Sequence, residues 1–417
     1  MKILLIAQYY YPFIGGVETH VRQVAHELSR QGHQVEIVAA TFTACPLPGK
    51  LAVLYYSLLT PAYESYKDGD VQVHALTPTW LDRIRMLPIT VRVMPILRGL
   101  FFTPLNRFGY PFYKSVFLDR LKALIKDVDV VHSFAGNYLG WTAQAAAQAF
   151  DIPFVCTPFV HPNQWGDDPA SVEYYQRSNA VIGLLKSDRD YLASIGVSEE
   201  KLQTIGVSPD LPETTDAIGF RQRHGLENVP LVLYTGRMMR QKGAKDLLAA
   251  TQQVWEHVPD ARFVFIGPTT AESQEWFENV DSRVTSLGRV SHQEKADALA
   301  ACDVFCMPSM SEILPTVYLE AWTYGKPVVG GRAEGLPELI EGNGAGIAVS
   351  QKPDDIAAAL IHLLQSSDLR EEFGRSGQQV VEREYSALSV VRQLEHVYKS
   401  LTKPASPIEQ ESIQSIC

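Results

Sequence analysis

The chain opens with KILLIAQYY (residues 2–10), VETHVRQVAHELSRQG (17–32) and VEIVAA (35–40), and this stretch decides the fold. The first and third segments are short, continuous apolar runs, whereas the second has the pattern of an amphipathic helix. A strand that is apolar at every position is buried on both faces, which is typical of a parallel sheet covered by helices on both sides. The stretch therefore predicts the opening unit of a doubly wound α/β sheet.

The same alternation continues in two series along the chain. Apolar runs of the first series are DVVHSF (129–134), PFVCTPFV (153–160) and AVIGLL (180–185), and those of the second are LVLYTGRM (231–238), RFVFIG (262–267), VFCMPS (304–309) and PVVGG (327–331). Between the two series, residues 205–230 show little periodicity and are rich in Pro, Asp and Thr, as linkers are.

This layout predicts two Rossmann-like, doubly wound parallel-sheet domains that face each other across a cleft. We expect an N-terminal domain over residues 1–210 and a C-terminal domain over 211–385. A helix over 386–402 is expected to pack back on the N-terminal domain, and 403–417 to form a flexible tail.

Composition excludes several classes of protein. The 417 residues carry a formal net charge of −10, which argues against a nucleic-acid binder. No apolar run reaches the roughly 18 residues of a membrane span, and the N-terminus lacks the features of a signal peptide. Five cysteines without a C-x-x-C spacing predict no disulfide framework or zinc site, with Cys156, Cys302 and Cys306 as buried small hydrophobes. We therefore expect a cytoplasmic protein.

Two loops that lead from an apolar run into a helix carry groups that bind anions. Paired glycines at Gly15 and Gly16 let a backbone approach an anion closely, and the helix that follows has a positive N-terminus. The second loop combines Gly236 and Arg237 with Lys242, and these two cations suit a diphosphate. The alternative for the first loop is a tight turn without a ligand, and the alternative for the second is a pair of charges that only contact solvent. Neither loop has the G-x-G-x-x-G spacing of dinucleotide enzymes, so NAD is not expected.

The run SEILPTVYLEAWTYGKPVV (311–329) holds two carboxylates eight residues apart. Proline is tolerated in a first helical turn, so a helix is expected to begin near Leu314 or Pro315. Glu312 then precedes the helix and Glu320 lies within it. A carboxylate accepts two hydroxyl hydrogen bonds, as a ribose or hexose offers them. The alternative is a capping carboxylate and an ordinary glutamate on a helix face.

GGVETHV (15–21), GRMMRQKG (236–243) and SEILPTVYLE (311–320), together with DVVHSF and GLPELI (335–340), resemble retaining glycosyltransferase family 4. The motifs stand in the same order and spacing, and the resemblance extends from Lys2 to about Tyr385. It is weakest over about 45–125. The resemblance implies a GT-B fold. It further implies metal-independent transfer of a hexose-type sugar, with retention, from a nucleotide-sugar donor to a glycan or lipid-linked acceptor.

The resemblance also assigns roles. Arg237 and Lys242 match the cations that hold the donor diphosphate, Glu320 matches the ribose ligand, and Glu312 matches the carboxylate beside the transferred sugar. The implied catalytic set is these two cations with Glu312 and His161. Further donor-binding positions that it implies are Gly15, Gly16, Gly236, Gly288, Arg289, Val290, Ile313, Leu314, Pro315 and Thr316. No cofactor and no metal are implied.

Two features depart from the family pattern. Most members carry Phe-Gly shortly after the first glutamate, where this chain has Ile313, Leu314 and Pro315, and proline removes one backbone donor. The family histidine is also displaced by two residues, to His161. A loop-capping role for His161 is the alternative, and His132 is the second candidate.

One segment reverses the sign of the overall charge. From Arg83 to Lys114 there is no Asp or Glu, and basic side chains alternate with apolar ones. Four prolines in this range predict short helical pieces instead of one long helix. The cations are Arg83, Arg85, Arg92, Arg98, Arg107 and Lys114. We expect an anionic membrane surface at its cytosolic face as a partner, with a hairpin packed on the sheet as the alternative.

Two rival functions stay open. A nucleotide-sugar epimerase shares the two-domain form, and a non-catalytic nucleotide-sugar-binding protein shares the predicted site. A glycosidase is disfavoured, because the cations Arg237 and Lys242 have no role in paired-carboxylate chemistry.

Overall fold

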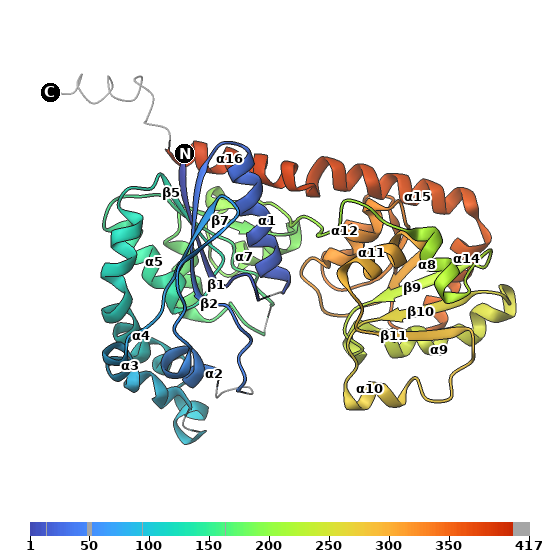
Figure 1. The fold of residues 1–417 in the computed structure, drawn as a ribbon, viewed down its shortest axis with the longest axis horizontal. Coiled ribbons are helices and arrows are strands. Elements are labelled where there is room, and N and C mark those ends of the chain that lie inside the picture. Colours follow the sequence, from blue (N-terminus) through green and yellow to red (C-terminus); the bar gives the residue numbers. More distant parts are fainter. Residues whose placement is uncertain (14, 48–51, 94, 163, 403–417) are drawn as a thin grey trace. The chain divides into compact units, whose positions relative to one another are not determined.

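The computed structural model describes residues 1–13, 15–47, 52–93, 95–162 and 164–402, with the side chains of 53, 57 and 91–106 left out (Figure 1). The chain forms two compact units. The first combines Met1–Ile205 with the chain from Val390 onward, and the second is Gly206–Ser389. The second unit thus begins before the predicted residue 211 and extends beyond 385. The predicted tail at 403–417 lies outside the described residues.

An eight-stranded sheet forms the centre of the first unit, in the order β3-β4-β2-β1-β5-β6-β7-β8. All neighbours are parallel except β3 and β4, which form an antiparallel edge pair that the sequence did not predict. The strands are β1 (Lys2–Tyr9), β2 (Gln34–Thr41), β3 (Tyr66–Asp68), β4 (Val71–Ala75), β5 (Val130–Ser133), β6 (Phe154–Cys156), β7 (Ala180–Gly183) and β8 (Leu202–Thr204). In β1, Leu5 stands opposite Ile37 of β2 and His132 of β5.

Helices cover both faces of this sheet, which explains why its central strands are apolar at every position. Leu4 and Ile6 of β1 pack with α4 and α5 on one face, and Ile3 and Leu5 pack with α1 and α16 on the other. Figure 1 shows α1 and α16 on the same side of the unit. The helices of this unit are α1 (Gly16–Arg30), α2 (Ala52–Leu54), α3 (Trp80–Met86), α4 (Pro95–Ile125), α5 (Tyr138–Gln148), α6 (Pro169–Gln176), α7 (Lys186–Ser194) and α16 (Ala387–Thr402).

The prediction of short helical pieces over the basic segment was wrong for its second half. Helix α4 continues through Pro104 and Pro111 to a length of 31 residues. Each internal proline removes a backbone hydrogen bond and costs about 3 kcal/mol. Burial of Phe117 and Leu121 in the core offsets that cost. No helix in the described part of the chain is both long and apolar enough to cross a bilayer.

The second unit is built on a six-stranded, all-parallel sheet in the order β11-β10-β9-β12-β13-β14. Its strands are β9 (Leu231–Thr235), β10 (Arg262–Ile266), β11 (Val284–Gly288), β12 (Val304–Met307), β13 (Val328–Gly331) and β14 (Gly346–Val349). Its helices are α8 (Ala217–His224), α9 (Ala244–His257), α10 (Ala271–Glu275), α11 (His292–Ala301), α12 (Thr316–Thr323), α13 (Leu336–Ile340), α14 (Pro353–Gln365) and α15 (Ser367–Val380). Cys156, Cys302 and Cys306 are fully buried, which confirms them as small core residues.

A buried carboxylate joins α1 to the edge of the first sheet. Asp68 accepts hydrogen bonds from Arg22 at 2.8 and 2.9 Å, from Tyr10 at 3.0 Å, and shares one with His26 at 3.0 Å. Burial raises the pKa of Asp68, but the bonds from Arg22, His26 and Tyr10 outweigh it and lower the pKa to about 2. The charged form is therefore the one that the fold stabilises.

Asp68→Asn should lower the free energy of unfolding by about 1–2 kcal/mol, because the amide replaces a carboxylate that accepts from Arg22, Tyr10 and His26, while the half-exposed Arg22 guanidinium can still reach water. Since the folded pKa of Asp68 is depressed, its contribution is present above the unfolded value of 3.8 and is lost as pH falls toward 2. Urea unfolding at pH 7 and at pH 3 measures both effects. Equal stability of the variant and the wild type at pH 7 would contradict the assignment.

Candidate functional site

In both sheets the strand order reverses at one point, and the predicted residues follow the strands on either side of it. The reversal lies between β1 and β5 in the first unit and between β9 and β12 in the second. Ligands of such sheets bind outside the carboxyl ends of the strands at this point. Gly15 and Gly16 follow β1, Gly236 and Arg237 follow β9, and Glu312 follows β12.

The second unit brings Lys242 and Glu312 into contact. The Nζ atom of Lys242 lies 2.5 Å from Oε1 of Glu312 and 3.4 Å from the carbonyl oxygen of Ser311. Gly243 makes this approach feasible, because its φ is 78° and an added Cβ would stand 2.6 Å from the carbonyl oxygen of Pro308. The loops after β9 and β12 therefore pack tightly and place a cation and a carboxylate side by side.

Glu320 lies in α12 and is almost fully buried, with 3% of its surface exposed. Its Oε1 accepts a hydrogen bond from Nζ of Lys295 at 2.9 Å, whereas its buried Oε2 has no partner among the described residues. Burial raises the pKa of Glu320, and the charge of Lys295 opposes that shift. One buried carboxylate oxygen is thus available to a hydroxyl donor.

The remaining second-unit positions of the predicted donor set lie at or after the carboxyl ends of strands β9, β11 and β12 of the same sheet. The side chain of Arg237 is exposed, and so is that of Arg289. Gly236 and Gly288 adopt positive φ angles of 156° and 64°, respectively. Pro315 directly precedes α12, which confirms the predicted helix start, and Glu312 lies before the helix. Ile313, Leu314 and Thr316 complete the stretch between Glu312 and the first turn of α12.

His132 is a structural residue, which corrects its place as a second candidate. It is 0% exposed, and hydrogen bonds join its Nδ1 to the Tyr398 hydroxyl at 2.6 Å and its Nε2 to the Thr157 hydroxyl at 2.8 Å. Burial lowers its pKa to about 3. With both nitrogens engaged inside the core, His132 has none to offer a ligand.

His161 lies in a tightly folded loop after β6. Its backbone N–H donates to the carbonyl of Trp165 at 3.1 Å, and the two rings lie 3.8 Å apart. The indole N–H of Trp165 donates to the carbonyl of Phe159 at 3.2 Å. Phe159 has a φ of 49°, which a bulky residue rarely adopts. Strained backbone of this kind concentrates at functional sites, so the loop is a good candidate for one.

The loop borders a cavity of about 410 Å³ at the reversal point of the first sheet. Phe159 and Trp165 line it, together with Gln8, Asn137 and Glu18. Burial raises the pKa of the Glu18 carboxyl. The sequence analysis missed these polar residues, although Glu18 stands inside the quoted GGVETHV motif. Within the described ranges, no group of three or more His, Cys, Asp or Glu side chains is arranged to hold a metal ion.

The predicted residues therefore divide between the units. Gly15, Gly16 and His161 belong to the first unit, whereas the two cations and both glutamates belong to the second. Within the second unit, contact is established between Lys242 and Glu312. Glu320 is paired instead with Lys295, a residue that the sequence analysis did not single out.

Known families match both units. The profile of the glycosyl transferase 4-like domain matches residues 15–207, and that of glycosyl transferases group 1 matches residues 218–380. The chain is 30% identical over 280 residues to the GDP-mannose-dependent monoacylated alpha-(1-6)-phosphatidylinositol monomannoside mannosyltransferase of Corynebacterium glutamicum, covering 63% of this chain and 74% of that protein. It is 25% identical over 425 residues to the phosphatidyl-myo-inositol mannosyltransferase of Mycolicibacterium smegmatis, covering 96% and 94%.

Solved structures agree on the fold. Anabaena HepE in complex with UDP and glucose aligns with a TM-score of 0.67 at 18% identity, over 96% of this chain and 100% of that one. Sucrose-phosphate synthase from Thermosynechococcus elongatus aligns with a TM-score of 0.69 at 20% identity, over 96% and 98%. The predicted resemblance is thereby confirmed: the chain belongs to the group 1, family 4-like glycosyltransferases and has their GT-B fold.

Proposed function

We propose that this glycosyltransferase moves a hexose-type sugar, with retention and without a metal, from a nucleotide-sugar donor to a hydroxyl of a glycan or lipid-linked acceptor. The observation that carries the proposal is the contact of Lys242 with Glu312 at the strand-order reversal of the second sheet. Two curated relatives are named as mannosyltransferases that act on phosphatidylinositol derivatives, which supports a hexose and a lipid acceptor.

Each group has a part in this chemistry. Arg237 and Lys242 supply positive charge to the departing diphosphate, which is the stabilisation that a metal ion would otherwise provide. Oε2 of Glu320 accepts a hydrogen bond from a ribose hydroxyl, and this satisfies its unpartnered lone pairs. Glu312 lies beside Lys242 and is placed to bind the hydroxyls of the transferred sugar. His161 orients the donor from the first unit.

A panel of nucleotide sugars tests the proposal, with release of nucleoside diphosphate as the first readout. The product made from the active donor is then analysed by NMR, with and without EDTA. We expect the anomeric configuration of the donor to be kept and the rate to be unaffected by EDTA. An inverted product excludes retention, and loss of activity in EDTA excludes metal independence. Interconversion of the nucleotide sugar without diphosphate release identifies an epimerase.

His161→Ala should lower turnover at least about tenfold, because a small loss of positioning is costly in group transfer. The melting temperature should stay within about 4 °C, which corresponds to roughly 1 kcal/mol. His257→Ala, at an exposed histidine of the second unit, is the matched control. If His161→Ala loses fold and activity together, the residue caps its loop. If the variant is stable and fully active, His161 is not part of the donor-binding site.

We propose further that the protein works at the cytosolic face of an anionic membrane. The surface proposed for this role consists of apolar side chains exposed by helix α3 and by the residue that follows it, and Trp80 alone is 68% exposed. The other exposed apolar residues of this surface are Leu81, Ile84 and Leu87. Arg85, on the same helix, is exposed beside them. Such a mixture of apolar, aromatic and basic side chains is typical of helices that lie in a membrane interface.

The cations of the segment are not equivalent in this role. Arg83 donates to the carbonyl oxygens of Leu58 and Thr60, so it stabilises the fold. Arg107 forms an ion pair with Glu173 at 3.2 Å. Lys114 lies 5.9 Å from the ring centre of Tyr110. The side chains of Arg92 and Arg98 lie outside the described residues. Among the described cations of this segment, Arg85 is therefore the one on which the membrane proposal rests.

Trp80→Ser combined with Ile84→Ser should weaken binding to phosphatidylglycerol vesicles at least about tenfold, because burying each apolar side chain is worth about 1.5–3 kcal/mol. Co-sedimentation measures the effect, which should also weaken with salt. Ile218→Ser is the matched control, since Ile218 is 74% exposed but lies in the second unit. A wild type that ignores anionic vesicles at low salt would contradict the membrane proposal.

A further inference from the structure

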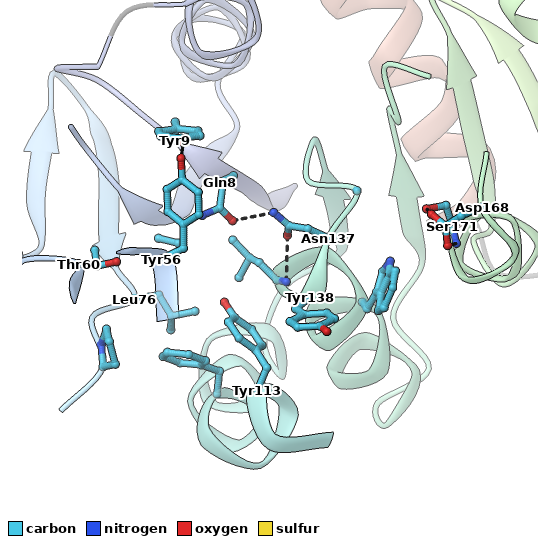
Figure 2. Close-up of a pocket in the computed structure, with 16 residues that line it drawn as sticks. Gln8, Tyr9, Tyr56, Thr60, Leu76, Tyr113, Asn137, Tyr138, Asp168 and Ser171 are labelled. Atoms are coloured by element: carbon cyan, nitrogen blue, oxygen red, sulfur yellow. Dashed lines mark hydrogen bonds between the residues drawn. The ribbon is translucent and has the colours of Figure 1, made fainter. Parts of the chain in front are cut away.

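The first unit holds a second cavity, of about 380 Å³, which none of the predicted site residues lines. Its walls come from β1, β2, α4, α5 and the segments that contain Thr60 and Leu76. In Figure 2 the side chains of Tyr56, Leu76 and Tyr113 surround one space, and Asp168 and Ser171 lie to one side of it. Aromatic and aliphatic groups form most of the wall, which favours an apolar occupant.

Polar groups in the wall are largely satisfied within the protein. The amide of Asn137 donates to Oε1 of Gln8 at 2.8 Å and accepts from a backbone N–H of α5 at 3.0 Å (Figure 2). The hydroxyl of Thr60 donates to a backbone carbonyl at 2.8 Å. The indole N–H of Trp141 is buried without a partner among the described residues, and the Tyr113 hydroxyl forms no hydrogen bond with them either. A ligand rich in hydroxyls would gain little here, whereas a hydrocarbon gains by leaving water.

The position of the cavity links two features described above. It shares six wall residues with the cavity at the strand-order reversal, where an acceptor hydroxyl would meet the transferred sugar: Gln8, Tyr9, Gly136, Asn137, Asp168 and Ser171. On another side its wall includes Pro78, two residues before the exposed Trp80 of α3. The cavity thus adjoins both the reaction side of the unit and the proposed membrane surface.

We propose that this cavity holds a single hydrocarbon chain of the acceptor, an acyl or isoprenoid tail, while the hydroxyl that receives the sugar occupies the neighbouring cavity beside Glu18. This inference rests on the proposed function and narrows its acceptor to an amphiphile. Burial of the chain selects lipid-borne acceptors over free sugars, and α3 takes up such acceptors from the membrane surface.

Binding of a homologous series tests the proposal without any donor. Methyl, hexyl, octyl and decyl β-D-glucopyranosides are titrated below their critical micelle concentrations by calorimetry. Affinity should rise about fourfold for each methylene group that enters the cavity, and then level off when it is full. A flat series, or tighter binding of maltotriose than of decyl glucoside, overturns the proposal in favour of a soluble glycan.

Two variants fill the cavity. Gly136 has no strained φ, and an added Cβ would meet only the carbonyl oxygen of Pro158, at 4.0 Å, so Gly136→Leu projects into nearly open space. Ala40→Leu places a leucine side chain in the wall from β2. Both should abolish the dependence on chain length. Ala40 lines this cavity and not the neighbouring one, so Ala40→Leu should leave methyl glucoside unaffected. Gly136 lines both cavities, so Gly136→Leu should also weaken methyl glucoside binding. Ala149→Leu, at the exposed C-terminal end of α5, is the matched control.

The variants also distinguish a failure of the cavity proposal from a failure of the membrane or transferase proposals. If chain-length dependence persists in both filled variants but disappears in Trp80→Ser, the alkyl chains bind the surface of α3 and the cavity proposal is wrong. Binding of nucleoside diphosphate to the same samples reports independently on the second unit. If wild-type protein binds decyl glucoside but no nucleoside diphosphate, the hydrocarbon site stands and the transferase proposal is contradicted. If it binds nucleoside diphosphate but not decyl glucoside, the transferase proposal stands and the hydrocarbon site is contradicted.

Discussion

Replacing Arg237 and Lys242 together by alanine should lower the affinity for nucleoside diphosphate at least about a hundredfold. Hydrogen bonds to charged groups contribute about 1.5–3 kcal/mol each, so two of them amount to about 3 kcal/mol or more. Turnover should fall further, because charge accumulates on the diphosphate as the sugar leaves. Calorimetry with UDP and GDP measures the first effect, and diphosphate release measures the second.

Arg240→Ala is the control for this double variant. Arg240 is a cation of the same loop, but it forms an ion pair with Glu272 at 2.7 Å. Its loss should leave diphosphate affinity within about fivefold, since an exposed pair contributes at most about 1 kcal/mol. If the Arg237 and Lys242 double variant binds nucleoside diphosphate as tightly as the wild type, the donor site does not lie at this loop.

Glu320→Gln should have opposite effects on binding and on stability. The affinity for nucleoside diphosphate should fall about tenfold or more, because the amide accepts ribose hydroxyls less strongly than the carboxylate does. The wild type should also prefer a ribose over a 2′,3′-dideoxyribose diphosphate, and the variant should lose that preference. Calorimetry with the matched pair of ligands isolates the hydroxyl contribution, and equal preference in both proteins would contradict a ribose-binding role.

The stability effect follows from the raised pKa of Glu320, caused first by burial. A carboxyl group whose folded pKa is raised favours the fold below its unfolded value of 4.5, and that contribution is lost as pH rises through the folded pKa. Glu320→Gln removes this loss, so the ligand-free variant should unfold at a higher temperature than the wild type at pH 8. A lower melting temperature would show that the pair with Lys295 outweighs burial.

Strand periodicity predicted both sheets, because each central strand is buried on both faces and therefore continuously apolar. The edge pair of β3 and β4 escaped that criterion, since a short edge strand needs no apolar run. The prolines of α4 led to a wrong prediction of helix breaks. Local propensity predicted breaks at Pro104 and Pro111, but packing of the helix against the first sheet supplies more free energy than the lost hydrogen bonds remove.

Site residues were predictable where a loop motif carries them and unpredictable where the fold assembles them. Lys242 and Glu312 stand in recognisable motifs, yet their contact depends on the close approach of two loops 70 residues apart. The role of His132 could not be read from its position at the carboxyl end of a strand, because Tyr398, its partner, comes from α16. The hydrocarbon cavity has no motif, since its walls come from many separate segments.

The helix α16 has a consequence for synthesis of the protein on the ribosome. It buries Val391 and Leu394 against β1, although the residues 206–389 of the second unit are translated in between. At about 5–20 residues per second, those 184 residues take roughly 10–40 s to emerge. Throughout that interval the nascent first unit exposes the apolar face that α16 later covers. The unit translated first is therefore completed last, and the exposed face is where a chaperone would bind the growing chain.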